Sequence, residues 1–212
     1  MYKFVLFDMD GTVLNTLDDI HSAVNYTLRH FGYPEVTLNQ TKHNTGNASR
    51  NLIAKSCPEG ADVDEALNFY VPYYQANCSK NTKPYDGIIE LMKKLREKGI
   101  KIAVVSNKKD GAVKDLNEKW FKGLTDAAIG ETDGYNRKPS PDLVFKAMEE
   151  IGAKKEECVY VGDTEVDILT ARNSGIPCIC VTWGFRDIDE IIDLGADWYC
   201  DNCDEVYDRI IG

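Results

Sequence analysis

The sequence predicts an α/β protein with a doubly wound, Rossmann-like parallel sheet and an inserted helical cap domain. Three observations support this fold class. Short apolar runs recur along the chain, helical patterns separate most of them, and one segment near the N-terminus shows helical patterns only. With 212 residues, the chain can bury about 70% of its unfolded surface and so form a substantial core.

Six apolar runs are expected to form strands. Several of them are continuously apolar, which is typical of parallel strands that are buried on both faces. The six runs are residues 4–7, 100–105, 127–129, 159–161, 176–181 and 196–199.

Amphipathic patterns lie between these runs. Residues 86–98 carry a repeating apolar stripe that ends at Gly99, and residues 140–151 repeat the arrangement and end at Gly152. Glycine is common directly after a helix because it adopts the left-handed conformation without steric cost. Strands that alternate with helices in this way form a doubly wound sheet.

Residues 15–85 break the alternation. They contain no convincing strand. Helical spacing is present instead, at residues 20–31, 48–56 and 63–75. We therefore assign residues 1–14 and 86–212 to an α/β core domain, and residues 15–85 to a helical cap domain.

The composition excludes several classes of partner. The chain has 25 Lys and Arg against 35 Asp and Glu, a net charge of −10, which disfavours binding to nucleic acid or to an anionic membrane. The apolar run after the first residues is too short for a signal sequence or a membrane span, so we expect a cytoplasmic protein. Seven cysteines, an odd number, fit reduced thiols better than a disulfide framework.

The strongest chemical signal follows the first apolar run. Asp8 and Asp10 stand one residue apart, and Gly11 and Thr12 come next. Two neighbouring carboxylates raise each other's pKa unless a cation compensates them, and a divalent metal is the natural candidate. The glycine permits a tight turn whose backbone N–H groups can face a phosphate.

Three further motifs stand at or near predicted strand ends. Ser106 follows the second run, Lys138 stands just before a helix that begins at a proline, and Asp163 follows the fourth run with Asp167 one helical turn later. The carboxyl ends of parallel strands meet at one edge of a sheet, where open α/β folds bind ligands. No histidine of the chain lies in the predicted core domain, so a histidine-dependent nucleophile has no partner there.

This order of motifs, Asp-x-Asp-Gly-Thr, strand-Ser, Lys-Pro and Gly-Asp-x-x-x-Asp, resembles that of the haloacid dehalogenase superfamily, and specifically its phosphatases. The resemblance runs from residue 4 to about residue 201. The residues that flank the first motif, the helical insert and the stretch 136–141 look most like phosphoglycolate phosphatases and their close relatives.

The resemblance implies catalysis through an aspartyl-phosphate. Asp8 would be the nucleophile, and Asp10 would be the general acid toward the leaving oxygen and then the base for water. Ser106 and the backbone N–H of Asn107 would bind the phosphoryl oxygens, together with the turn at Gly11 and Thr12. Lys138 would offset the accumulating negative charge.

The resemblance also implies Mg²⁺ as the cofactor. Its ligands would be Asp8, the main-chain carbonyl of Asp10, and Asp163, while Asp167 would steady a bound water.

In the cap, residues 41–50 form an unusually polar stretch. It is either a solvated loop or a loop that reads the part of the substrate that is not transferred. If that part carries a carboxylate, Lys42, His43 and Arg50 are the expected partners. His21 and His30 are expected at the surface.

We therefore expect Mg²⁺-dependent hydrolysis of a small phosphomonoester, with phosphoglycolate as the leading substrate, because a lid excludes water and bulky substrates. Three alternatives stay open: a sugar phosphomutase of the same fold, a pyrophosphatase or nucleotidase, and a phospho-accepting or silent binding module. The expected partner is a small phosphate ester, with no nucleic acid and no membrane, and the protein is expected to be a monomer or a homodimer.

Overall fold

The computed structural model describes all residues from 1 to 212 and divides into two compact units. Met1–Leu14 and Pro84–Gly212 form one unit, here called the core domain, and Asn15–Lys83 form the other, here called the cap domain. The first of the predicted boundaries falls at the same residue, and the second falls two residues later. None of the helices has the length and apolar character needed to cross a lipid bilayer.

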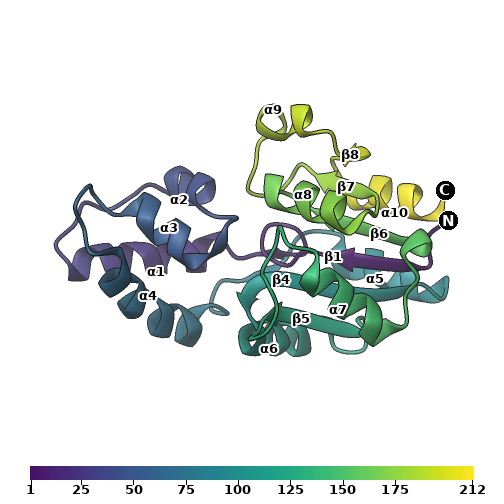
Figure 1. The fold of residues 1–212 in the computed structure, drawn as a ribbon, viewed down its shortest axis with the longest axis horizontal. Helices are drawn as coiled ribbons and strands as arrows, with labels where there is room; N and C mark the ends of the chain where they lie inside the picture. Colours follow the sequence, from purple (N-terminus) through teal and green to yellow (C-terminus); the bar gives the residue numbers. More distant parts are fainter. The chain divides into compact units, whose positions relative to one another are not determined.

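The core domain contains a six-stranded sheet in the order β5-β4-β1-β6-β7-β8, in which every neighbouring pair is parallel (Figure 1). Its strands are β1 (Phe4–Phe7), β4 (Lys101–Lys109), β5 (Ala127–Glu131), β6 (Cys158–Gly162), β7 (Cys178–Val181) and β8 (Trp198–Cys200). This confirms the predicted fold class. The order places β1 between β4 and β6, so residues that follow these three strands come together at one edge.

Helices cover both faces of this sheet. Val5 and Phe7 of β1 point into one apolar cluster, and Phe4 and Leu6 point into the other, because side chains alternate along a strand. The first cluster is closed by α5 (Ile88–Glu97), α6 (Asp110–Phe121) and α10 (Cys203–Ile211). The second is closed by α7 (Asp142–Ile151), α8 (Glu165–Ser174) and the short α9 (Ile188–Ile191).

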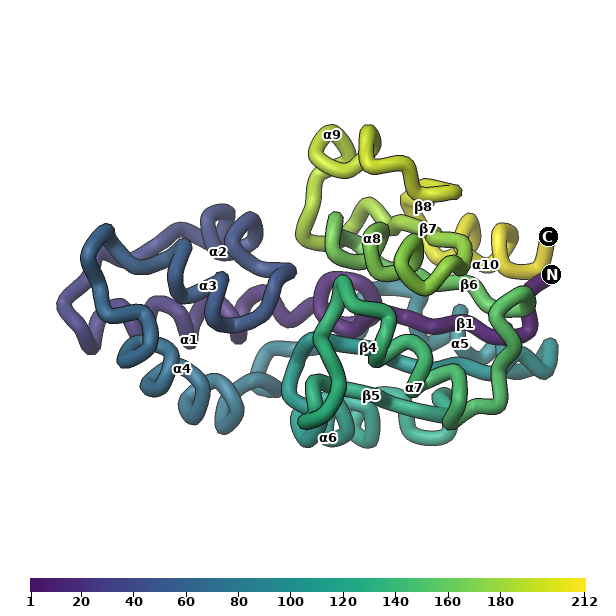
Figure 2. Tube along the Cα trace, in the orientation of Figure 1, coloured from purple at the N-terminus to yellow at the C-terminus, as the bar shows by residue number.

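The two ends of the chain meet on this domain. The backbone N–H of Tyr2 donates to the carbonyl of Ile210 over 2.9 Å, and the termini lie side by side in Figure 2. All seven cysteines are free.

The cap domain consists of four helices, α1 (Leu17–His30), α2 (Leu38–Asn44), α3 (Ala48–Ser56) and α4 (Val63–Asn77). Where the chain passes between the units, the two-residue strands β2 (Leu14–Asn15) and β3 (Lys83–Pro84) pair with each other. The prediction of no strand in this segment missed them, because two residues are too few to show an alternating pattern.

The polar stretch at residues 41–50 is mostly helical, not a loop. Thr37 and Gln40 form a capping box, in which the Thr37 Oγ1 accepts from the Gln40 N–H and the Gln40 side chain accepts from the Thr37 N–H. This starts α2, whose only buried residue is Thr41, so the helix has no apolar stripe that a sequence pattern could reveal.

The two cap histidines that were expected at the surface differ from each other. His30 is exposed and stacks on the ring of Phe69 at 3.9 Å between centroids. His21 is half-buried, and its Nδ1 lies 2.9 Å from the Thr41 Oγ1, so the expectation is wrong for this residue.

Candidate active site

The predicted strand-end residues of the core domain converge at the carboxyl edge of β1, β4 and β6. Phe7, the last residue of β1, pairs with Val104 on one side and Val161 on the other. The backbone N–H of Asp8 then donates to the carbonyl of Val161 over 2.8 Å, which extends the ladder by one residue. Asp8 is therefore fixed between the two neighbouring strands.

A buried ammonium group links two of the predicted carboxylates. Lys138 Nζ lies 2.7 Å from Asp8 Oδ1 and 2.7 Å from Asp167 Oδ1, and it donates to the Tyr160 hydroxyl over 3.0 Å. All four side chains are buried. Tyr160 was not predicted, because it stands inside an apolar strand and nothing in its neighbours distinguishes it from a core residue.

Backbone N–H groups and hydroxyl groups also donate to two of the carboxylates, Asp167 and Asp163. Asp167 Oδ2 accepts from the N–H and the hydroxyl of Thr164, at 3.1 and 2.8 Å. Asp163 accepts from the Thr12 hydroxyl at 2.8 Å and from the Phe185 N–H at 2.7 Å. The Thr12 hydroxyl, predicted to bind substrate, is thus engaged with Asp163, and Phe185 was not predicted at all.

The buried cluster contains more acidic groups than basic ones, and this shifts their pKa values. Burial and the charge of Asp167 raise the pKa of Asp8 well above its usual range, and the same two causes raise the pKa of Asp163 to about 7. Burial opposes ionisation of Asp167 as well, but Lys138 outweighs it and lowers the pKa of that carboxyl. Burial opposes the charge of Lys138 too, and Asp167 and Asp8 outweigh it and raise the lysine pKa.

These residues fit a divalent cation. Carboxylate oxygens of Asp8, Asp163 and Asp167 lie within 4.8 Å of one another, and the ammonium of Lys138 pairs with only two of them, Asp8 and Asp167. Magnesium prefers oxygen ligands of this kind. The raised pKa values of Asp8 and Asp163 indicate that the protein's own groups leave negative charge uncompensated, which a cation would remove.

Gly11 is needed for a steric reason besides its turn. Its φ is +91°, and a Cβ at this position would lie 2.3 Å from Asp163 Oδ2. The turn after β1 therefore packs directly against the carboxylate of Asp163, and only glycine allows that approach.

Ser106 and Asn107 contact two different parts of the site. The Ser106 hydroxyl donates to Asp10 Oδ2 over 3.4 Å. The side-chain amide of Asn107 accepts from the Lys138 N–H at 2.8 Å and donates to the Lys138 carbonyl at 3.0 Å. These paired bonds hold the backbone of Lys138. The structure thus brings together all the core residues that the sequence analysis selected, while their roles stay predictions.

Lys108 is a further residue of the site that was not predicted. Its Nζ lies 3.0 Å from Asp10 Oδ1, and its side chain is 6% exposed. The available signal was its position two residues after Ser106, which places both side chains on one face if the strand continues.

Two of the three candidates of the cap domain contact residues of that domain. Arg50 Nη2 lies 2.9 Å from Asp64 Oδ1, and both side chains are more than half exposed. His43 Nδ1 lies 2.8 Å from the Asn39 carbonyl. Lys42, like His43, is half-buried in α2. Their predicted contact with substrate stays a prediction.

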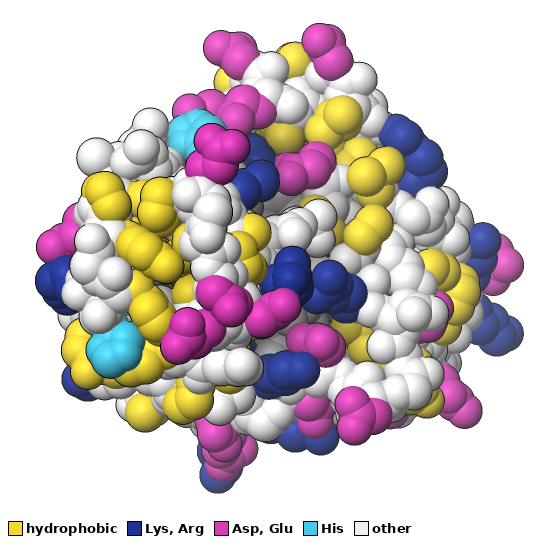
Figure 3. All heavy atoms as spheres, turned by 60° about the vertical axis from the view of Figure 1, so that its left-hand side comes forward, with side chains coloured by type: hydrophobic (Ala, Val, Ile, Leu, Met, Phe, Trp, Pro, Cys, Tyr) yellow, Lys and Arg dark blue, Asp and Glu magenta, His cyan; other side chains and the backbone are white.

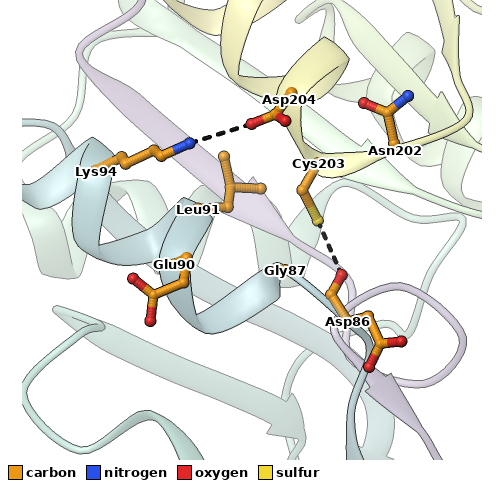
Figure 4. Close-up of a pocket in the computed structure, with 8 residues that line it drawn as sticks. All are labelled: Asp86, Gly87, Glu90, Leu91, Lys94, Asn202, Cys203 and Asp204. Atoms are coloured by element: carbon orange, nitrogen blue, oxygen red, sulfur yellow. Dashed lines mark hydrogen bonds and ion pairs between the residues drawn. The ribbon is translucent and has the colours of Figure 1, made fainter.

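A separate cavity of about 350 Å³ lies between the first turns of α5 and α10 (Figure 4). Lys94 pairs with Asp204 at 3.1 Å across it, and the Cys203 thiol donates to the Asp86 carbonyl at 3.5 Å. Burial raises the pKa of Cys203 to about 11, so at neutral pH the thiol is protonated and not a nucleophile. The cavity contains none of the strand-end residues.

Acidic and basic side chains are interspersed on the face of the molecule drawn in Figure 3. That face carries no broad basic patch of the kind that binds a nucleic-acid backbone.

Comparisons with known proteins agree with this geometry. A family model for haloacid dehalogenase-like hydrolases matches residues 5–181. A phosphoglycolate phosphatase of Agrobacterium fabrum is 34% identical over 209 residues, which cover 93% of this chain and 87% of the relative. The pyrophosphatase PpaX of Halalkalibacterium halodurans is 31% identical over 207 residues, covering 97% and 95% of the two chains.

Solved structures show the same fold over the full length. A crystal structure from Lactobacillus delbrueckii subsp. bulgaricus, of a protein provisionally assigned as a phosphoglycolate phosphatase, superposes with a TM-score of 0.93 at 37% identity. The match covers 99% of this chain and 98% of the other.

Proposed function

The chain belongs to the haloacid dehalogenase-like hydrolase family, and from that premise we propose that it is a Mg²⁺-dependent phosphatase of a small phosphate monoester that acts through a phosphorylated Asp8. The observation that carries the proposal is the buried network at the end of β1. There Lys138 bridges Asp8 and Asp167 at 2.7 Å each, beside a third acid, Asp163.

In the first step, an oxygen of Asp8 attacks phosphorus and the bond from phosphorus to the leaving oxygen breaks. The leaving oxygen takes a proton from Asp10. Lys138 holds Asp8 Oδ1, which fixes the orientation of the nucleophile and offsets part of the charge on the phosphoryl group. Ser106 and the N–H of Asn107 bind the phosphoryl oxygens.

In the second step, water attacks phosphorus and gives a proton to Asp10, and the bond between phosphorus and Asp8 breaks. Inorganic phosphate leaves, and the carboxylate of Asp8 is restored. Mg²⁺, when bound by Asp8, the carbonyl of Asp10 and Asp163, would neutralise charge on the phosphoryl oxygens. Asp167 would hold a water of that ion and keeps Lys138 in place.

Phosphoglycolate is the leading substrate, because curated relatives with that name cover most of this chain at about one-third identity. Pyrophosphate is the second candidate, since the relative PpaX matches 97% of the chain. The cap residues Lys42, His43 and Arg50 stay the candidate contacts for a carboxylate on the leaving group. We also retain a cytoplasmic location and a monomeric or homodimeric state as predictions.

The test is phosphate release from phosphoglycolate, pyrophosphate, a hexose 1-phosphate, a mononucleotide and p-nitrophenyl phosphate, with Mg²⁺ or with a chelator. We expect metal-dependent turnover that Asp8→Asn lowers on the order of 10⁴-fold or more, because an amide cannot form the acyl phosphate. Asp133→Asn makes the same change at an exposed site of the core domain and is the matched control. Equal rates for Asp8→Asn and the wild type would rule out Asp8 as nucleophile, and conversion of the hexose 1-phosphate to its 6-phosphate would indicate a mutase.

A further inference from the structure

We propose that Lys108 is a positioning residue that holds the Asp10 carboxyl in the orientation needed for proton transfer. The inference rests on the proposed phosphatase function, in which Asp10 gives a proton to the leaving oxygen. Lys108 lies in the core domain, as Asp10 does, so the contact is internal to one compact unit.

Both oxygens of Asp10 are constrained from β4. The Ser106 hydroxyl donates to Oδ2 over 3.4 Å, and the Lys108 ammonium lies 3.0 Å from Oδ1. The second contact lacks hydrogen-bond angles, so it is an ion pair, and Oδ1 is a buried atom without a hydrogen-bond donor. Buried polar atoms are seldom left without a partner, and functional sites are a common place for the exceptions. The charge of Lys108 is therefore the contact that holds this oxygen.

The strand explains why two side chains reach the same carboxylate. Side chains at positions i and i+2 of a strand share one face, which places Ser106 and Lys108 on the side of Asp10 and Asn107 on the side of Lys138. The Lys108 N–H also donates to the Ser106 Oγ over 3.1 Å. The serine and the lysine therefore act as one local unit.

A register shift between β4 and β5 accompanies the orientation of Ser106 and Lys108 toward Asp10. Val105 pairs with Ile129 and Lys109 pairs with Glu131, so β4 advances four residues while β5 advances two. Bulges of this kind turn side chains toward active sites. Gly130 stands at the same place on β5, where a Cβ would lie 2.7 Å from the Lys108 carbonyl and 2.4 Å from the Asp110 Cα. The missing side chain at Gly130 makes room for the bulge.

Burial distinguishes Lys108 from its neighbour. The side chain of Lys108 is 6% exposed, whereas that of Lys109, paired with Glu131 at 3.2 Å, is 58% exposed. A lysine is a flexible chain with a strongly hydrated charge, so an exposed lysine contributes little orientation to its partner. A buried ammonium beside a carboxylate restrains that carboxylate much more.

The proposal predicts an effect that depends on the leaving group. Breaking the ester bond of an alkyl phosphate leaves an alkoxide, which needs the proton of Asp10 as the bond breaks. Nitrophenolate is a stable anion and leaves without that proton. Loss of the orientation of Asp10 should therefore slow the phosphorylation of Asp8 by alkyl phosphates. The rate of the same step with p-nitrophenyl phosphate should stay nearly unchanged.

The experiment compares Lys108→Met, Lys108→Arg and Lys109→Met with the wild type. The rate of the first turnover, in which Asp8 is phosphorylated, is measured with KM for phosphoglycolate, ethyl phosphate and p-nitrophenyl phosphate. We expect Lys108→Met to lower this rate about 10²-fold on both alkyl phosphates, with a small change in the release of nitrophenolate. Lys108→Arg should recover part of the loss because it restores the charge, and Lys109→Met should behave as the wild type.

Three other results would overturn the proposal. Equal losses of the first-turnover rate on all three substrates would mean a general structural role, because the release of nitrophenolate in that step does not need the proton of Asp10. A rise in KM for phosphoglycolate alone would mean that Lys108 binds the substrate carboxylate. No turnover of any substrate by the wild type would instead reject the proposed function, and the positioning role with it.

Discussion

Buried carboxylates of the two domains are stabilised in different ways. In the cap domain, Asp19 is 4% exposed and accepts five hydrogen bonds, three from Asn81 and two from Thr82, at 2.8 to 3.0 Å. In the core domain, Asp8 and Asp167 share the single ammonium of Lys138. The first arrangement satisfies one anion with neutral donors, and the second leaves several anions with too little positive charge.

The difference separates a structural acid from chemical ones. The bonds of Asp19 tie the start of α1 to residues 81 and 82, and they leave no oxygen for a ligand. In the core, burial and neighbouring charge raise the pKa values of Asp8 and Asp163. Burial alone therefore does not identify an active site, whereas an uncompensated group of buried acids does.

Removing Lys138 should have the largest effect on stability. Lys138→Met leaves Asp8 and Asp167 without their ammonium, and loss of one partner of a buried pair costs about 3–5 kcal/mol of unfolding free energy. Urea denaturation measures it. Lys109→Met, which breaks an exposed pair, should cost no more than about 1 kcal/mol. Equal costs for the two variants would mean that the buried ammonium of Lys138 compensates Asp8 and Asp167 no better than an exposed lysine compensates its partner.

Addition of Mg²⁺ should have the next largest effect on stability. We expect this effect to depend on the buried acids of the core domain and not on Asp19. A ligand that binds only the folded state stabilises it by about 2.7 kcal/mol at 100 times its Kd. Thermal melts with and without Mg²⁺ should show this gain for the wild type and for Asp19→Asn. Asp163→Asn should lose the gain, because it removes one of the three clustered carboxylates. A gain that persists in Asp163→Asn would place the ion elsewhere.

Asp19→Asn should have a smaller and purely structural effect. An amide has one acceptor oxygen, so some of the N–H and O–H donors of Asn81 and Thr82 lose their partner at a cost of about 1–3 kcal/mol. Denaturation measures that cost, and kcat on p-nitrophenyl phosphate should stay within a few-fold of the wild type. A loss of turnover as large as that of Asp8→Asn would show that Asp19 is not merely structural.

Asp110→Asn, which changes a partly exposed carboxylate, should have the smallest effect on stability. Burial works against the charge of Asp110, but the Lys114 ammonium at 2.7 Å and the Gly130 N–H outweigh it and lower the pKa. A lowered pKa stabilises the fold above the unfolded value of about 3.9, and this stability is lost as the pH falls through the folded value. Asp110→Asn should therefore lose less stability in acid than the wild type, by under about 1 kcal/mol. Identical acid profiles in urea denaturation would contradict this sign.

The sheet and the strand-end acids are predictable because their signals are local. An apolar run that ends at Asp8 or Asp163 can be recognised without any knowledge of distant residues, and the order of motifs places both at one edge. Helices α5 and α7, which carry apolar stripes, were predicted for the same reason, and their ends differ from the expected ones by only a few residues.

The residues that were missed depend on distant contacts. Tyr160 is a site residue only because Lys138 reaches its hydroxyl from another segment. Lys108 requires the knowledge that β4 continues to Lys109, although the apolar run ends at Val105. The helix at Leu38–Asn44 begins with a capping box and buries one residue, so hydrophobic periodicity could not reveal it.

The most direct test of the central claim is a single-turnover reaction of Asp10→Asn with p-nitrophenyl phosphate and Mg²⁺. The nitrophenolate leaves without a proton, but the following hydrolysis lacks its base. We predict a rapid burst of one nitrophenolate per protein, and a protein whose mass has grown by one phosphoryl group on the peptide that contains Asp8. Phosphate release by the wild type, with no burst in the variant and no phosphoryl group on that peptide, would contradict the claim.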